Sequence, residues 1–177
     1  MLDDIQNQTP EMKIPIDQVG VSALTYPIVV MDRSNVNQQT VGRFSVSVGL
    51  PREFKGTHMS RFVEILNEHQ GEINMRTLPM ILRNMKSRLG SESARIEVSF
   101  PYFISRTAPI SQAGGLMDYD CKFIGSVRGN DYDFVLKVTV PVSTLCPCSN
   151  AISDHGAHNP RGYVSLEVRT PTEPAGE

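Results

Sequence analysis

The chain has 177 residues, of which 40% are hydrophobic and 20% are charged, and its formal net charge is -2. This composition predicts a globular protein with a hydrophobic core. A net charge so close to zero provides no overall attraction to nucleic acid or to an anionic membrane, so we expect neither as a partner.

Three cysteines are few for a secreted disulfide scaffold, and their odd number argues against complete pairing. The first residues are polar and acidic, without the basic start and apolar run of a signal peptide. No apolar run reaches the length of a membrane span. These features predict a cytoplasmic location in which the thiols stay reduced.

The first half of the chain is expected to change from strand to helix. Residues 1–13 are predicted to form a flexible arm, and a short strand is predicted over 25–31. Residues 41–50 alternate apolar and polar side chains with the period of two that marks a half-buried strand. The period changes to that of a helix over 58–69 and 77–89, which predicts two amphipathic helices.

The two predicted helices have recognisable ends. Thr57 is placed to cap the start of the first helix, and Gly90 is placed to end the second. Three methionines near them, Met75, Met80 and Met85, are interpreted as core residues, because a flexible thioether fills irregular gaps.

Strand periodicity returns after the helices. The predicted strands cover 95–103, 119–127, 132–142 and 162–170. Strands on both sides of a helix pair predict an α+β fold, an antiparallel sheet with the two helices on one face. Residues 99–120 are interpreted either as a long ordered loop lining a site or as a plain strand connection. The last two strands resemble the opening pair, as if a second copy of the unit began there.

The segment CPCSNAISDHGAHNPR, residues 146–161, contains two of the three cysteines and two of the four histidines. Thiolate and imidazole are both good zinc ligands, so Cys146, Cys148, His155 and His158 are candidates for a closed structural zinc site. A catalytic zinc with fewer protein ligands, or a catalytic thiol, is a second interpretation. The third is an ordinary polar loop.

A second segment, LPREFKGTHMSR, brings cations to the predicted start of a helix. Lys55, His58 and Arg61 bracket a Gly-Thr turn. Free N–H groups and the positive end of the helix dipole favour an anion there. The alternative is that Thr57 only caps the helix while the cations are solvated.

Several motifs together resemble one known family. They are IPIDQVGV, LPREFKGTHMSRF, SFPYF, TAPIS, LMDYD and VPVSTLCPCSNAISDHGAHNPRG. The combination resembles GTP cyclohydrolase type IB, a bacterial and archaeal folate-pathway family, over about residues 14 to 169.

The resemblance implies a fold and a division of the chain. The fold is the tunnelling fold, or T-fold, whose unit is two strands, two helices and two strands. The implied first unit covers 14–131, and 132–177 hold the first strands of a second unit with the metal-binding loop at 143–161.

The resemblance also implies a metal-dependent GTP cyclohydrolase. Such an enzyme hydrolyses GTP to 7,8-dihydroneopterin triphosphate and formate, the first step of tetrahydrofolate biosynthesis. Cys146 and His158 would bind the metal and act in catalysis, while Cys148 and His155 would support them. Zinc is the expected metal, and manganese and iron are also possible. The triphosphate needs cations, for which Lys55, His58 and Arg61 are candidates.

Family members are longer than this chain, and the resemblance places a further glutamate and histidine ligand, and the glutamate that anchors guanine, in the additional part. It also implies a homo-oligomer, a dimer or tetramer. Two alternatives remain open. One is a non-catalytic oligomerisation module stabilised by zinc, and the other is a relative that acts on another pterin or purine.

Overall fold

The computed structural model describes residues 10–12, 14–31, 37–69, 72–154 and 158–170. The arm predicted over 1–13 therefore falls mainly outside the described residues. Among the residues that are described, no helix is long and apolar enough to cross a membrane.

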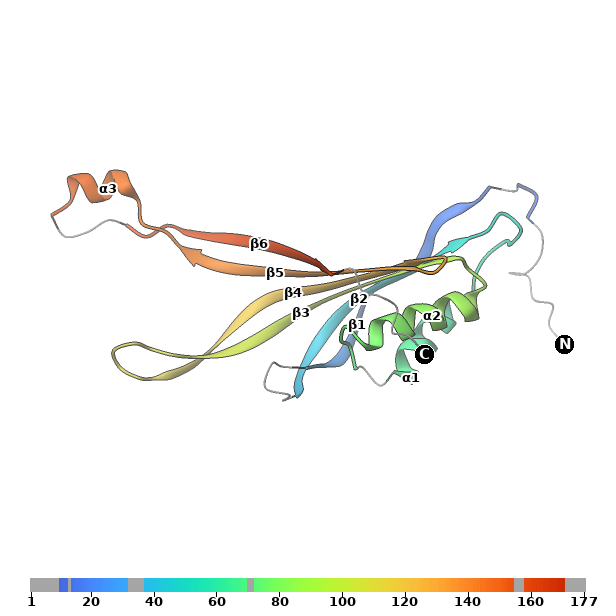
Figure 1. Cartoon of the computed structure of the whole chain (residues 1–177), viewed down its shortest axis with the longest axis horizontal. Coiled ribbons are helices and arrows are strands. Elements are labelled where there is room, and N and C mark those ends of the chain that lie inside the picture. Colours follow the sequence, from blue (N-terminus) through green and yellow to red (C-terminus); the bar gives the residue numbers. More distant parts are fainter. Residues whose placement is uncertain (1–9, 13, 32–36, 70–71, 155–157, 171–177) are drawn as a thin grey trace.

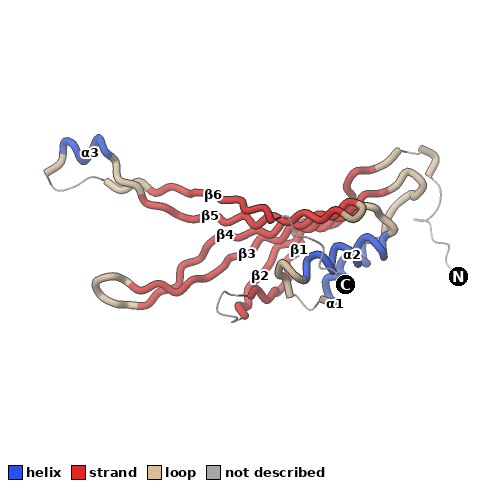
Figure 2. The backbone as a smooth tube through the Cα atoms, in the orientation of Figure 1, coloured by secondary structure: helices blue, strands red, loops and turns tan. Residues whose placement is uncertain are grey.

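The framework is one six-stranded antiparallel sheet in which each strand pairs with its neighbour in the chain (Figure 2). The strands are β1 (Ile16–Met31), β2 (Asn37–Leu50), β3 (Ser93–Thr107), β4 (Gly114–Arg128), β5 (Asp131–Ser143) and β6 (Arg161–Thr170). A tight turn makes β4 and β5 antiparallel neighbours, whereas β2 reaches β3 through the two helices.

Two helices, α1 (Met59–Glu68) and α2 (Thr77–Leu89), lie on the same face of the sheet (Figure 1). The end of α2 is as predicted, because Gly90 adopts the left-handed conformation, with φ of 61°. The predicted cap of α1 is wrong. His58 occupies the capping position without a side-chain hydrogen bond to the helix, and Thr57 is buried.

The core lies between these helices and the sheet, and its members follow the predicted periodicities. The fully buried side chains include Phe44, Val48, Phe62, Ile65, Leu78, Ile81, Leu82, Met85 and Ile96. Each large apolar side chain removed from water contributes about 1.5–3 kcal/mol. Met75 and Met80 are not core residues, since they are 41% and 56% exposed. Met75 lies in the turn before α2, and Met80 lies on an exposed side of α2. An apolar side chain occupies such exposed positions at little cost.

β1 is longer than predicted, because it begins at Ile16 and not at residue 25. Its register with β2 shifts between Ile16 and Val19 and again between Val21 and Leu24. Ala23 has a φ of 58° at the second shift. Each shift interrupts the alternation of side chains, so this part of the strand leaves no period of two in the sequence.

The expected fold class, an α+β tunnelling fold with a second unit begun, is wrong. β5 follows β4 through the turn at Gly129 and pairs with it from Arg128 and Asp131 to Asp120 and Thr139. The last strands therefore extend the first sheet, and the molecule is mostly sheet with few helices. The division at residue 131 into two units stays a prediction.

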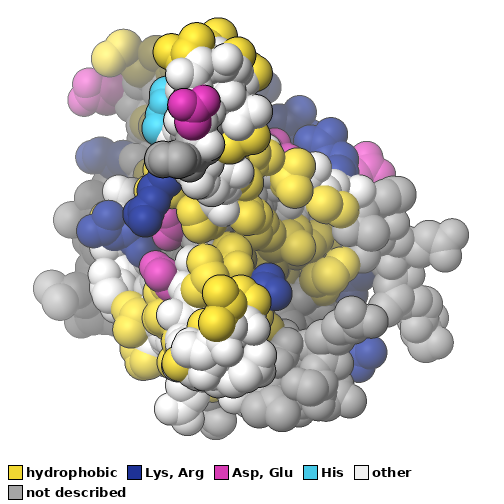
Figure 3. Space-filling model, turned by 90° about the vertical axis from the view of Figure 1, so that its left-hand side faces the viewer, with side chains coloured by type: hydrophobic (Ala, Val, Ile, Leu, Met, Phe, Trp, Pro, Cys, Tyr) yellow, Lys and Arg dark blue, Asp and Glu magenta, His cyan; other side chains and the backbone are white. Residues whose placement is uncertain are grey.

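Beyond the helices the sheet splits into two projecting hairpins (Figure 1). One is formed by β3 and β4, which pair as far as Thr107 and Gly114, so residues 99–120 are a strand connection and not a loop. The other is formed by β5 and β6 and carries the short helix α3 (Pro147–Ile152) at its tip. Viewed onto this end of the molecule, apolar side chains gather in a hollow between the hairpins (Figure 3).

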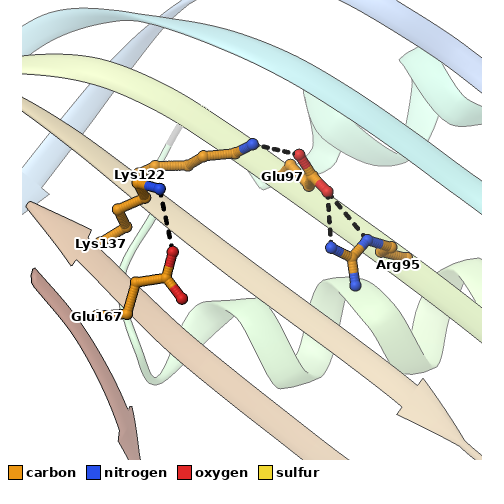
Figure 4. Close-up of polar contacts among 5 residues, drawn as sticks. All are labelled: Arg95, Glu97, Lys122, Lys137 and Glu167. Carbon is orange, nitrogen blue, oxygen red and sulfur yellow. Dashed lines mark hydrogen bonds and ion pairs between the residues drawn. The ribbon is translucent and has the colours of Figure 1, made fainter. Parts of the chain in front are cut away.

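The other face of the sheet carries ion pairs within and between strands (Figure 4). Glu97 on β3 accepts hydrogen bonds from Arg95 and contacts Lys122 on β4, and Lys137 pairs with Glu167 at 3.0 Å. Partial burial acts to raise the pKa of Glu97, but the hydrogen bonds from Lys122 and Arg95 outweigh it, so that pKa is lowered. These pairs favour the observed strand register.

Candidate metal and substrate site

The loop between β5 and β6 is closed at its base by backbone hydrogen bonds. The amide of Thr144 donates to the carbonyl of Pro160 at 3.1 Å, and the amide of Cys146 donates to the carbonyl of His158 at 3.3 Å. These bonds continue the β5–β6 pairing, which ends at Ser143 and Arg161. The structure thus brings Cys146 and His158 side by side, although eleven residues separate them in the chain.

Ser149 holds this base together. Its hydroxyl donates to the carbonyl of Cys146 at 3.3 Å and accepts from the amide of His158 at 3.2 Å. Cys146 also occupies the capping position of α3, and its carbonyl accepts from the amide of Asn150 at 3.1 Å. Ser149 was not among the predicted site residues. Its spacing of three from Cys146, at the start of a helical turn, is the signal that would have suggested it.

The Cys146 thiol has an environment that favours the thiolate. Hydrogen bonding by the backbone and then the side chain of Ser149 lowers the pKa of Cys146; a smaller desolvation effect opposes this, and Cys148 adds a further lowering. Cys121 is the opposite case, since burial raises the pKa of its thiol. A metal ligand or nucleophile must be deprotonated, so Cys146 is better prepared for either role than Cys121.

The other two predicted ligands, Cys148 and His155, give less information about a metal site. Cys148 is exposed on α3, and His155 lies outside the described residues. The residues whose positions are described contain no group of three or more histidine, cysteine and carboxylate side chains that would hold a metal. Cys146 and His158 meet through their backbones, and the closed four-ligand site is not seen among the described residues.

The predicted cationic segment lies elsewhere. His58 and Arg61 line a cavity of about 190 Å³ between the start of α1 and the end of α2, while Lys55 is exposed nearby. The guanidinium of Arg61 donates to the carbonyl of Arg88 at 2.9 Å, which fastens α1 to α2. This cavity is far along the molecule from α3 (Figure 1), so within one chain it does not meet the Cys146–His158 pair.

Comparison with known families shows the family to which the chain belongs. A family described as type I GTP cyclohydrolase folE2 matches residues 2–176. The chain belongs to this family. The match corrects the name given to the resemblance, GTP cyclohydrolase type IB with a tunnelling fold, to the family described as folE2.

Curated relatives agree with this family. The chain is 50% identical over 168 residues to GTP cyclohydrolase FolE2 of Nitrosomonas eutropha, covering 94% of this chain and 63% of the relative. It is 51% identical over 166 residues to that of Geobacter metallireducens, covering 94% and 63%, respectively. The protein of the same name from Syntrophobacter fumaroxidans is 50% identical, with 94% and 65% covered. The chain thus spans less than two thirds of the length of these relatives.

Proposed function

We propose that the protein to which this chain belongs is a metal-dependent GTP cyclohydrolase of folate biosynthesis, hydrolysing GTP to 7,8-dihydroneopterin triphosphate and formate. The observation that carries the proposal is family membership together with the paired Cys146 and His158. Relatives about 50% identical over 94% of this chain are named GTP cyclohydrolase FolE2.

We infer that zinc is the metal, with manganese and iron as alternatives. The donor set fits zinc, because a thiolate and an imidazole are ligands that this ion prefers. When bound, zinc supplies Lewis acidity that brings the pKa of a water molecule close to neutrality. Cys146 and His158 would supply two ligands, and further ligands are expected outside the described residues.

Within this proposal the chain's own residues have distinct tasks. Hydrogen bonding by Ser149 keeps Cys146 ready as a thiolate, and the Ser149 hydroxyl accepts from the amide of His158 and so keeps its backbone beside Cys146. Ring opening of the purine requires a proton to reach a leaving nitrogen, and a histidine near the reacting atoms is suited to deliver it. His58 and Arg61, with Lys55, would bind the triphosphate, and a second chain would have to bring them to the metal.

The test combines metal analysis with turnover. Purified chain is expected to contain zinc, and Cys146→Ser and His158→Ala each to lose it, while Cys148→Ser retains it. Zinc content unchanged in the first two variants would overturn the assignment of the ligands. Formate release from GTP, measured with the longest polypeptide that contains this sequence, is expected to fall at least about 100-fold in Cys146→Ser.

The same measurements separate the alternatives. If all four substitutions at Cys146, Cys148, His155 and His158 removed zinc and lowered the melting temperature, while GTP changed neither, a structural zinc module would replace the enzyme. A panel of purine and pterin substrates, with products identified by mass, would show whether a compound other than GTP is preferred.

We also propose that the protein is a homo-oligomer, a dimer or tetramer, in the cytoplasm. Support for assembly comes from an apolar hollow of about 460 Å³, which is lined by side chains of β1, β3, β4 and β5. Next to it, Leu166 and Val168 on β6 are each 57% exposed. Support for the location comes from three free cysteines, which suit a reducing compartment.

A further inference from the structure

We propose that the cavity between α2 and the turn joining β4 to β5 binds a small molecule carrying an oxyanion, a phosphate or a carboxylate. The cavity has a volume of about 590 Å³, within the range of small-molecule sites. It contains none of Cys146, His158, Lys55, His58 and Arg61. The inference therefore does not depend on the proposed activity.

The charge of the lining is positive. Arg83 and Lys86, one turn apart on α2, both line the cavity, and among the described residues no aspartate or glutamate does. Within the described part of the chain, Arg83 makes no ion pair and no hydrogen bond. Lys86 donates to the carbonyl of Gly129, a neutral acceptor, so its charge is not cancelled. Glu92 and Asp131 are close in sequence but do not line the cavity.

The cavity also offers neutral donors and an apolar wall. Ser87 and Asn130 line it, and neither side chain makes a hydrogen bond to another described residue. Pro79, Val127 and the ring of Tyr132 form the apolar part of the lining. Two cations and two uncommitted polar groups around an apolar wall match an organic ligand with an anionic group.

The walls of the cavity are held in place before any ligand binds. Lys86 joins α2 to the turn, and the amide of Gly129 donates to the carbonyl of Glu92 at 3.0 Å. Gly129 has a φ of 57°, the left-handed conformation that this tight turn requires and that glycine adopts without strain. A preformed wall lowers the ordering cost of binding.

The test uses backbone amide NMR of the purified chain at constant ionic strength. Inorganic phosphate and acetate are titrated separately, to distinguish the two oxyanions. We expect saturable shifts at Gly129, Asn130 and Ser91 with at least one of them. Arg83→Gln should weaken that affinity about tenfold, because it removes a charge-assisted hydrogen bond. Arg83 is exposed, so this variant is expected to fold.

The matched control is Arg76→Gln, which removes an exposed arginine at the start of the same helix, outside the cavity. It should leave the affinity unchanged. Shifts that do not saturate with either anion, or an equal affinity in Arg83→Gln and the unsubstituted chain, would overturn the proposal. Shifts confined to residues 54–61 would also overturn it, since the anion would then bind at the cavity of His58.

Discussion

At the scale of single residues, the site depends on the hydrogen bonds that surround Cys146 in the loop at the tip of β5 and β6. Ser149 joins Cys146 to His158 and also lowers the pKa of the Cys146 thiol. The same residue, Ser149, thus favours the thiolate of Cys146 and positions the backbone of His158 beside it. Removing it should affect the reactivity of the thiol as well as the order of the loop.

The reactivity of the three thiols toward iodoacetamide tests this environment in metal-free chain. Because the pKa of Cys146 is lowered, a larger fraction is thiolate at a given pH, and its alkylation should reach half-maximal rate at a lower pH than that of an ordinary thiol. Cys121 should react slowly throughout, since it is buried and its pKa is raised. Mass spectrometry of digested protein measures each site.

Ser149→Ala is the matched variant for that measurement. Its Cys146 profile should move to higher pH, while the Cys121 profile stays where it is. If the Cys146 profile were the same with and without the Ser149 side chain, the hydroxyl would have no part in activating the thiol.

At the scale of elements, β1 shows how close packing of two backbones constrains a sequence. A Cβ atom on Gly20 would lie 1.9 Å from the carbonyl oxygen of Val46 on β2. Non-bonded contacts of a Cβ atom are essentially never shorter than 3.0 Å, so one strand would have to move. Glycine is required here by the neighbouring backbone, at a strand whose register is already irregular.

Gly20→Ala should lower the free energy of unfolding by at least about 2 kcal/mol, because the added methyl group pushes β1 from β2. Denaturant unfolding followed by circular dichroism measures it. Gly115→Ala on β4 is the control, since a Cβ atom there meets nothing within 4 Å. Its effect should stay within about 1 kcal/mol. Equal stability of the two variants would show that β1 does not approach β2 so closely.

At the scale of the whole molecule, the sheet is larger than the helices that cover it. α1 and α2 pack on the face of β1 to β4 (Figure 1), whereas Leu166 and Val168 on β6 remain exposed in the described part of the single chain. Leu166 pairs with Val138 and Val168 with Leu136, so these side chains form one apolar surface. Exposed apolar surfaces of this kind favour association.

We expect the chain to form oligomers that dissociate when this surface becomes charged. Leu166→Glu should reduce the mass measured by light scattering toward that of a single chain. Ser165→Glu is the matched control, because this neighbour lies on the opposite face of β6 and pairs with Thr139 there. An unsubstituted chain that is monomeric at all concentrations, or equal masses for both variants, would contradict assembly through this face.

The sequence by itself determined the elements with a clear period. α2 lies over the predicted residues, and Gly90 ends it, because a helix stop is a local property of the backbone. The motifs around Cys146 and His58 pointed to a GTP cyclohydrolase family, whose name the family match then corrected.

Only the tertiary structure decided how these parts are placed. The start of β1 and the extension of β3 and β4 depend on pairing with a neighbouring strand, which the period of a single segment does not reveal. It also decided that β5 continues the first sheet, and that Cys146 lies beside His158 but far from the cavity of His58. The physical reason is that residues far apart in a chain meet only through long-range hydrogen bonds and burial, which belong to the folded molecule as a whole.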